Sequence, residues 1–443
     1  MKISKRFGFL ISLLLISLVI VGCSSNNNNA GDNADQNATN DSASDEQIEI
    51  TFWHIYSDGP LKDMMTELIA EFEEQNPHIV VDELGTNFFD YFTKLSTAMA
   101  GGAGPDLAMN DTTTVPVRAS AGSILSIDQF VEQDEDFNVD DFYPVLIDKM
   151  TYEGSLYGLP SDTDVRVLYY NKDHFEEVGL DPESPPTNWD ELAEYAEQLT
   201  VWDSNGLVER MGFSPETGIS NLHFHTFAWT NGGEFWDEDG NPTFTSPENL
   251  EALQWFKDMN DYYGEAAVSA FRSRASALDY SPFIDGSVSM VVEVNNLYQD
   301  IKRYAPDLNF GVAPIPYQVE PATWSAGFDY EIIDNNDEDR AAAAWELLKF
   351  LTSEETQIKV HKESGSLVSN MNAAEAPQFM EDPIWATMVE QMDHARFIEY
   401  IEALPAWHTT ADSAEEAVLN AGVDPEEALQ EAQEIAENAV KNH

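Results

Sequence analysis

A chain of 443 residues that carries 81 acidic and only 21 basic side chains has a formal charge of −60 at pH 7. This charge excludes nucleic acid and anionic lipid surfaces as partners, since binding either one needs clustered lysine or arginine. Because 43% of the residues are hydrophobic and 11% are aromatic, the sequence also differs from acidic disordered tails, and we expect it to fold.

The negative charge also bears on the stability of the folded state. Repulsion among like charges destabilises a compact chain unless salt screens it, and at 1 M salt the screening length falls to about 3 Å. The composition therefore favours a saline or alkaline environment acting on an exposed surface. The alternative is that the acidity only keeps the protein soluble.

The first 25 residues have the pattern of an export signal. Three basic residues precede an apolar run at 7–21 that is short for a membrane span. Residues 18–23, LVIVGC, resemble a bacterial lipobox, in which the chain is cut before the cysteine and the cysteine carries a lipid. We expect 1–22 to be a lipoprotein signal peptide and Cys23, the only cysteine, to be lipidated, the alternative being a free or buried thiol.

Residues 23–47 predict a flexible tether. From Ser24 to Gln47 there is no aromatic or branched aliphatic side chain, so this segment cannot bury enough apolar surface to offset the entropy of ordering. As a coil it would reach roughly 25 to 30 Å. The remaining 396 residues are too many for a single core and indicate two lobes.

Strand and helix patterns alternate directly after this tether. Residues 48–53 and 79–81 are rich in β-branched and aromatic side chains, and 61–75 has helical periodicity between them. A second helix at 89–100 precedes a short apolar run at 106–109. Such alternation predicts a mainly parallel sheet covered by helices.

The rest of the chain continues in the same way. We expect strands at 156–159, 165–170, 287–294 and 310–314, and helices at 189–199, 247–263, 341–351 and 424–442. Because no repeat of 20 to 50 residues is present, the sequence argues against a solenoid.

Short motifs follow one another in order along the chain. They are 51–54 (TFWH), 71–77 (EFEEQNP), 104–106 (GPD), 157–160 (YGLP), 168–172 (LYYNK), 186–192 (PTNWDEL) and 310–316 (FGVAPIP). Their joint order resembles bacterial extracellular solute-binding protein family 1, the branch of ATP-driven importer proteins that includes maltose-binding and glycerol-phosphate-binding proteins. No single motif is specific, and the resemblance covers residues 48–443.

The resemblance implies an α/β, two-lobed, periplasmic-binding-protein-like fold of type II. Such a fold has mostly parallel sheets flanked by helices, a hinge between the lobes and the ligand in the cleft between them. By similarity the chain crosses near 159–160 and again near 314–317. We therefore expect an N-terminal lobe of residues 48–159 and 317–352 and a C-terminal lobe of residues 160–316 and 353–443.

Open α/β sheets bind ligands beyond the carboxyl ends of their strands. The candidates that follow the first three strands are Trp53, His54, Asn87, Asn110 and Asp111. The resemblance adds Asp162 and Asp164 beside the first hinge, Trp229, Asn231 and Asn295 in the second lobe, Trp324 just after the second hinge, and Trp407 before the C-terminal helices. A sugar offers an apolar face that stacks on indole and a rim of hydroxyls that carboxylates, amides and imidazoles bind. This mixture favours a neutral polyol, although each tryptophan can also be ordinary core packing.

An anionic ligand such as a glycerol phosphate is the first alternative. A phosphate needs a bidentate arginine or a row of backbone amides at a helix start. Arg166, on the strand beside the first hinge, and Arg396 keep this alternative open.

A secreted glycosidase is the alternative from another class of protein. Asp162 and Asp164 could serve as its acid and base, but close acidic pairs arise by chance among 81 acids. No nucleophile elbow, phosphate-binding loop or zinc-protease helix is present. We therefore expect no enzymatic activity and no cofactor.

A metal site is the last alternative. His223 and His225, together with His54, could bind zinc, but alternate residues on a strand face opposite sides. The acidic residues 237–241 lack the spacing and distal glutamate of a calcium loop. We therefore expect no metal.

The resemblance implies a monomeric receptor that is lipid-anchored through Cys23 on the extracytoplasmic face of the cell membrane. It would capture a mono- or oligosaccharide and deliver it to the transmembrane subunits of an ABC permease. Closure of the lobes around the sugar would be the signal, since a ligand that contacts both lobes binds the closed form more tightly.

Overall fold

The structure is a computed structural model that describes residues 47–216, 220–278 and 280–443. The predicted signal peptide at 1–22, the predicted lipidation site Cys23 and the predicted tether at 23–47, apart from Gln47, lie outside the described residues. Among the helices of these described ranges, none has both the length and the apolar character that crossing a bilayer requires.

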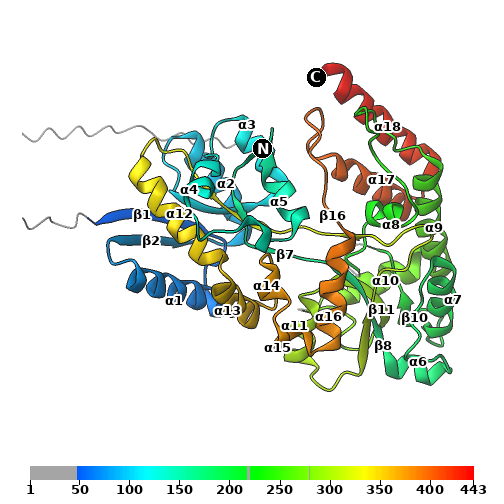
Figure 1. Cartoon of the computed structure of the whole chain (residues 1–443). Coiled ribbons are helices and arrows are strands. Elements are labelled where there is room, and N and C mark those ends of the chain that lie inside the picture. Colours follow the sequence, from blue (N-terminus) through cyan, green and yellow to red (C-terminus); the bar gives the residue numbers. More distant parts are fainter. Residues whose placement is uncertain (1–46, 217–219, 279) are drawn as a thin grey trace, which may run out of the picture. The chain divides into compact units, whose positions relative to one another are not determined.

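The first lobe is built on a five-stranded sheet with the order β2-β1-β3-β14-β6 (Figure 1). Its strands are β1 (Ile48–His54), β2 (Ile79–Gly85), β3 (Leu107–Asp111), β6 (Leu159–Pro160) and β14 (Phe328–Ile332). β1 pairs in parallel with β2 and β3, whereas β14, which comes from much later in the chain, is antiparallel to β3 and β6.

Helices cover this first sheet. They are α1 (Gly59–Gln75), α2 (Phe88–Ala100), α3 (Val115–Ser120), α4 (Asp128–Gln133), α5 (Pro144–Met150) and α12 (Glu338–Thr352), with 3-10 turns at Thr112–Thr114 and Val139–Asp141 and a hairpin of β4 (Thr151–Tyr152) and β5 (Ser155–Leu156). The buried stripe of α1 includes Met65, Ile69 and Phe72, which share a core cluster with Phe52 of β1. Burying each such side chain contributes about 1.5 to 3 kcal/mol, and this fixes the helix on the sheet.

The second lobe is built on another five-stranded sheet, with the order β12-β8-β11-β10-β9. Its strands are β8 (Arg166–Asn171), β9 (Val201–Trp202), β10 (Val208–Phe213), β11 (Val288–Val294) and β12 (Phe310–Ala313). β10 is parallel to β11, whereas β8 is antiparallel to β11 and β12. β9 is also antiparallel to β10. Parallel pairs therefore occur in both sheets but are not the majority that was expected, because the strands that connect the lobes, β8 and β14, run antiparallel to their neighbours.

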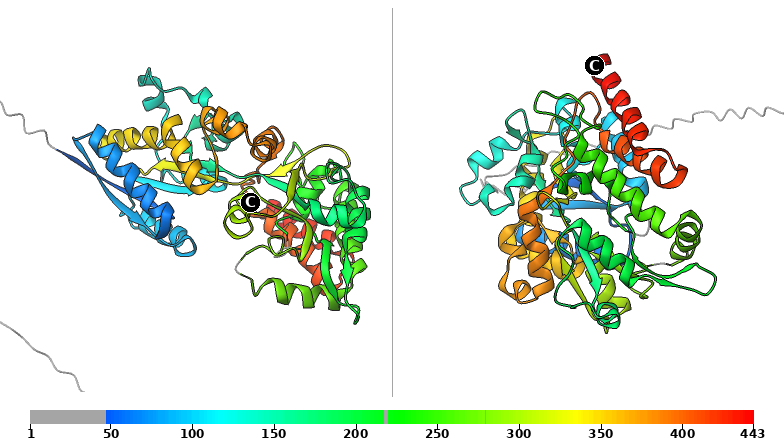
Figure 2. Two further views of the ribbon diagram at one scale, coloured as in Figure 1. Left: turned by 90° about the horizontal axis from the view of Figure 1, so that it is seen from below. Right: turned by 90° about the vertical axis from the view of Figure 1, so that its right-hand side faces the viewer.

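The helices of the second lobe include the C-terminal pair. They are α6 (Lys172–Val178), α7 (Trp189–Leu199), α8 (Phe224–Thr230), α9 (Pro247–Tyr263), α10 (Glu265–Ala275), α11 (Leu297–Tyr304), α17 (Trp407–Ala421) and α18 (Pro425–Asn442). Trp189 stacks on Phe227 with 4.1 Å between the ring centroids, which ties α7 to α8. α17 contacts α8 and α9, and the red C-terminal helix α18 lies against α9 and α17 (Figures 1 and 2).

A chain of short elements leads from α12 back to the second lobe. They are α13 (Glu354–Ser364), β15 (Leu367–Val368), α14 (Met371–Ala374), α15 (Pro377–Met380), α16 (Pro383–Glu390), a 3-10 turn at Gln391–His394 and β16 (Ala395–Arg396). α13 contacts α1 of the first lobe, and α16 contacts β12 of the second lobe. This segment therefore passes between the lobes.

Two further passages form the rest of the hinge. The first leads from β6 through β7 (Asp162–Thr163) to β8, and the second leads from β13 (Thr323–Trp324) to β14. We expected the second passage at 314–317, but Tyr317 donates its backbone N–H to Thr187 of the second lobe at 3.2 Å. The chain joins the first sheet only at Phe328, so the change of lobe falls at 325–327.

Side chains and one glycine hold these two passages together. Asp162 accepts a hydrogen bond from the backbone N–H of Phe328 at 3.1 Å, and Asp164 accepts one from Ala326 at 2.8 Å. A Cβ on Gly327 would lie 2.2 Å from the carbonyl oxygen of Asp162, so only glycine permits this close approach. The hinge is thus built from paired strands in direct backbone contact.

Candidate ligand-binding site at the junction of the lobes

The two candidates at the end of β1 have different surroundings. Trp53 is half-buried, and the Lys94 Nζ lies 5.1 Å from the centroid of its ring. His54 is buried, with its Nε2 2.8 Å from Oε1 of Glu83 on β2. Burial lowers the pKa of His54, so the ring is held neutral, and its hydrogen-bonding capacity is used inside the first lobe.

The candidates that follow β2 and β3 lie at helix starts. Asn87 caps α2 with its side chain, and Asp111 caps the 3-10 turn after β3. Asn110 is buried and donates from Nδ2 to Oε2 of Glu331 at 3.2 Å. Asn110 and Asp111 also line a pocket of about 550 Å³ in the first lobe.

A buried charge network lies under Asn110. Asp329 and Glu331, on β14, have no solvent exposure, and Nε of Arg118 donates to Oε2 of Glu331 at 2.7 Å. Neither carboxylate oxygen of Asp329 has a hydrogen-bond partner within the described residues, although Arg118 Nη2 lies 3.6 Å away. Burial raises the pKa of both acids, and the positive charge of Arg118 partly counteracts this rise. This network was not predicted from the sequence. Its only local sign there is the pair Asp329 and Glu331 within the otherwise apolar strand β14.

The carboxylates of the two hinge acids, Asp162 and Asp164, bind groups within the hinge. The carboxylate of Asp162 is buried, and burial raises its pKa to about 7 even though the N–H of Phe328 favours the ionised form. The carboxylate of Asp164 forms an ion pair with Arg166 in addition to its bond to Ala326. Asp162 and Asp164 thus hold the two crossing strands at the junction of the lobes.

The asparagines of the second lobe are buried and bonded within that lobe or to the hinge. Asn231 donates to the carbonyl of Glu248 at 3.2 Å and to Glu251 Oε2 at 3.1 Å. Asn295 has no exposed surface, and its Oδ1 accepts the backbone N–H of Val165 at 3.1 Å. Asn295 thus positions the backbone beside the hinge at Val165, whereas Asn231 binds to α9.

An aromatic and histidine cluster surrounds Trp324, which is half-buried. Its ring centroid lies 4.8 Å from that of His223 and 5.0 Å from that of His225, both edge-on, and the Arg166 guanidinium lies 3.9 Å from the centroid. Trp229 is buried 5.1 Å from His225. The Trp324 Nε1 is buried without a hydrogen-bond partner in the described part of the chain.

Trp407 belongs to the same cluster from its core side. It is 2% exposed, stacks on Phe235 with a centroid distance of 5.0 Å, and donates from Nε1 to the carbonyl of Glu399 at 3.0 Å. Its ring lies 6.4 Å from that of His225. Trp407 thus supports the histidine layer under Trp324.

The structure brings part of the predicted set together. Trp229, Trp324 and Trp407 form one cluster around His225, and Asp162 and Asp164 lie on the hinge next to Trp324. The Asp111 carboxylate of the first lobe acts electrostatically on Asp164 and on His408 of α17, so it faces this junction. The contacts that the described residues make with Trp53, His54, Asn87 and Asn231 lie elsewhere in the fold. Their role in ligand binding, like that of the whole set, stays a prediction.

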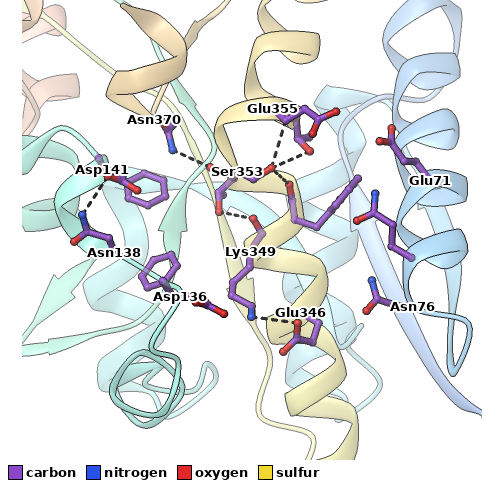
Figure 3. A pocket seen from close by; sticks show the side chains of 16 residues that line it. Glu71, Asn76, Asp136, Asn138, Asp141, Glu346, Lys349, Ser353, Glu355 and Asn370 are labelled. Atoms are coloured by element: carbon purple, nitrogen blue, oxygen red, sulfur yellow. Dashed lines mark hydrogen bonds and ion pairs between the residues drawn. The ribbon is translucent and has the colours of Figure 1, made fainter.

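A second pocket lies elsewhere in the fold, among α1, α12 and α13 (Figure 3). It has a volume of about 510 Å³ and is lined by Glu71, Glu346, Glu355 and other polar residues. Lys349 pairs there with Glu346 at 3.2 Å, and Asn370 donates to the Thr352 carbonyl at 3.4 Å. Because none of the predicted ligand residues lines it, we do not take it as the site.

The two-lobed α/β fold with a three-stranded hinge defines the chain as a periplasmic-binding-protein-like protein of type II. Residues 67–387 match the family described as bacterial extracellular solute-binding protein, and this chain belongs to that family. The role that follows is that of the substrate-binding component of an ABC importer.

Relatives and solved structures show the same likeness over nearly the whole chain. The sn-glycerol-3-phosphate-binding periplasmic protein UgpB of Escherichia coli (strain K12) is 26% identical over 417 residues, covering 87% of this chain and 91% of its own. CpMnBP1 with mannotriose bound has a TM-score of 0.74 and 27% identity, covering 88% of this chain and 100% of its own. A solute-binding protein of Thermotoga lettingae TMO bound with alpha-D-tagatose has a TM-score of 0.73 and 28% identity, covering 89% and 100%.

Proposed function

We propose that this protein captures a neutral mono- or oligosaccharide between its lobes and delivers it to the transmembrane subunits of an ABC permease. The observation that carries the choice of ligand is the state of the arginines at the junction. Arg118 pairs with Glu331, Arg166 with Asp164 and Arg396 with Glu234.

Paired arginines disfavour a phosphorylated ligand. A phosphate gains most from a guanidinium whose bidentate face is free. Here Arg118 binds Glu331 through Nε and Nη2, Arg166 binds Asn221 through Nε and Asp164 through Nη1, and Arg396 binds Glu234 through Nη2. The nearby carboxylates would also repel an anion. Although UgpB is named for glycerol 3-phosphate, the charges at this junction favour the neutral sugars seen in the two solved structures.

Trp324 is the predicted stacking surface. Arg166 holds the indole from one side, and the ring is half-exposed at the hinge, where closing lobes would meet a ligand. An apolar sugar face stacks on indole, and the ring hydroxyls donate to carboxylates such as Asp111. These two contact types come from different lobes, so a sugar that makes both favours the closed form.

The lobe boundaries and the anchor are part of the same proposal. We propose N-terminal and C-terminal lobes close to the predicted division, with the backbone bonds of 317–320 favouring a second boundary near 325.

We also propose that Cys23 carries a multi-chain lipid that keeps a monomeric receptor at the extracytoplasmic face of the membrane. Mass spectrometry of the native N-terminus tests the lipid.

A binding screen tests the ligand. The purified protein is titrated with mannose- and glucose-based oligosaccharides, tagatose and glycerol 3-phosphate, followed by tryptophan fluorescence and calorimetry. We expect saturable binding of at least one sugar and none of glycerol 3-phosphate. Binding of glycerol 3-phosphate alone would overturn the proposal, and chromatography of the incubated oligosaccharides should show no cleavage.

Two variants locate the site. Trp324→Ala should weaken sugar binding about five- to thirtyfold, since a stacked aromatic contributes on the order of 1 to 2 kcal/mol. Trp202→Ala, at an exposed tryptophan of β9, is the matched control and should leave the affinity unchanged. Equal affinities for both variants and the parent would remove Trp324 from the site.

A further inference from the structure

Three histidines and an aspartate from two helices gather beside Trp324. His223 immediately precedes α8 and His225 lies in its first turn. His408 and Asp412 lie one turn apart on α17, so they share a face of that helix. The charges of His223, His408 and Asp412 all act on His225, so the four side chains lie near one another.

The ligand atoms of three of these residues already have the spacing of a metal site. Nδ1 of His223 and Nδ1 of His225 lie 3.2 Å and 3.6 Å from the same Oδ1 of Asp412, and the three ligand atoms lie within 4.8 Å of one another. Around a tetrahedral zinc ion with bonds of about 2.0 to 2.1 Å, neighbouring ligand atoms are about 3.3 Å apart. Small side-chain shifts would complete this geometry.

The cluster contains buried nitrogen atoms that no protein group satisfies. Both ring nitrogens of His225, which has no exposed surface, and Nδ1 of His408 lack a hydrogen-bond partner within the residues that the structure describes. The 3.6 Å separation of His225 from Asp412 is too long for a hydrogen bond. Unpartnered buried nitrogens are costly, and a bound cation would use their lone pairs.

We propose that His223, His225 and Asp412 bind one divalent transition-metal ion of the zinc class, with a water molecule in the fourth position. Two imidazoles and one carboxylate suit zinc rather than calcium or magnesium, which prefer oxygen ligands. On a strand, alternate residues face opposite sides, which is why the sequence alone predicts no metal site here. The segment instead enters a helix, and the two rings stack with centroids 5.2 Å apart and an interplanar angle of 27°. His54, its proposed third ligand, is bound to Glu83 instead.

The bound ion would link α8 to α17 and so stabilise the second lobe. This effect does not depend on the proposed sugar function, since metal binding is measured without any sugar present. Because the surface is strongly acidic, the titration is done in 1 M NaCl, which screens weak binding to exposed carboxylates.

The test compares zinc and cobalt binding in the purified protein, in His223→Gln and in Asp412→Asn. These two side chains are 17% and 31% exposed, so both variants are expected to fold, and circular dichroism without metal checks this. His78→Gln, at an exposed histidine, is the matched control. Calorimetry gives stoichiometry and affinity, and thermal melts report stabilisation.

For the parent and the control we expect one zinc ion per chain, a higher melting temperature with zinc, and the intense visible absorption of tetrahedral cobalt(II). For both site variants we expect affinity at least tenfold weaker and loss of the zinc-dependent stabilisation. Unsaturable binding to the parent, equal binding by the variants, or only the weak absorption of six-coordinate cobalt would overturn the proposal. Binding of a sugar, or its absence, changes none of these outcomes.

Discussion

The carboxylate of Asp162 accepts a hydrogen bond from the backbone N–H of Phe328 at 3.1 Å, so a side chain of the first hinge strand holds the start of β14. The same carboxyl group is buried, and burial raises its pKa to about 7. The joint between the lobes therefore contains a group that changes charge near physiological pH.

This titration predicts a measurable pH dependence of stability. Below about pH 4 the carboxyl group is protonated in both states; between pH 4 and 7 the folded state retains a proton that the unfolded chain loses. Its contribution to the unfolding free energy therefore falls as the pH rises, by at most about 1.4 kcal/mol per pH unit. Asp162→Asn should remove this slope, so the variant gains stability relative to the parent between pH 5 and 8.

Urea unfolding at each pH measures this difference. Asp136→Asn, at an exposed acid, is the control and should follow the parent. A constant difference between Asp162→Asn and the parent from pH 5 to 8 would show that Asp162 titrates normally.

Arg118→Met should be strongly destabilising. It leaves Glu331 and Asp329 buried without their cation, and breaking a buried pair in this way typically costs about 3 to 5 kcal/mol. The unfolding free energy from urea titration is the measurement, and Arg303→Met, at an exposed arginine of α11, is the control. A loss below about 1 kcal/mol would mean that water reaches these carboxylates.

Gly327→Ala should strain the hinge. The added Cβ would overlap the Asp162 carbonyl at 2.2 Å, and overpacking of this kind costs about 1 to 3 kcal/mol. Gly101→Ala places its Cβ at an ordinary 3.4 Å from the nearest atom and serves as the control. Thermal melts of both variants decide the matter; equal melting temperatures would show that the crossing strands separate easily.

Salt should stabilise the protein. With a formal charge of −60, repulsion within the folded state falls as NaCl screens it, so the melting temperature should rise between 50 mM and 1 M NaCl. The double variant Glu431→Gln and Glu434→Gln removes two exposed charges of α18 and should show a smaller rise. A melting temperature that is flat or falls with salt would contradict the inference of a saline environment.

The local elements of this fold could be predicted from sequence because their signals are local. The helices α7 and α9 begin and end at the predicted residues, with Asn188 and Ser246 capping their first turns. Strand-forming composition likewise located β1, β2 and β11. Helix periodicity, caps and strand composition act within a few residues, so one sequence suffices to find them.

The site was harder to predict because its contacts join distant parts of the chain. No residue near Arg118 in the sequence indicates that it pairs with Glu331, and no residue near His223 indicates that it pairs with Asp412. The spacing of His223 and His225 was noticed but was interpreted on a strand, where it forbids convergence, whereas the chain enters α8 there. Both pairs form only when tertiary packing brings distant parts of the chain together.

β1 lies between β2 and β3, with hydrogen-bonded neighbours on both edges. Whatever precedes Ile48 is covalently attached to this strand, so tension at that point loads both ladders in shear rather than peeling one edge. If the proposed lipid on Cys23 holds the chain at the membrane, the first lobe is the attached lobe, and the second lobe moves relative to it when the lobes close.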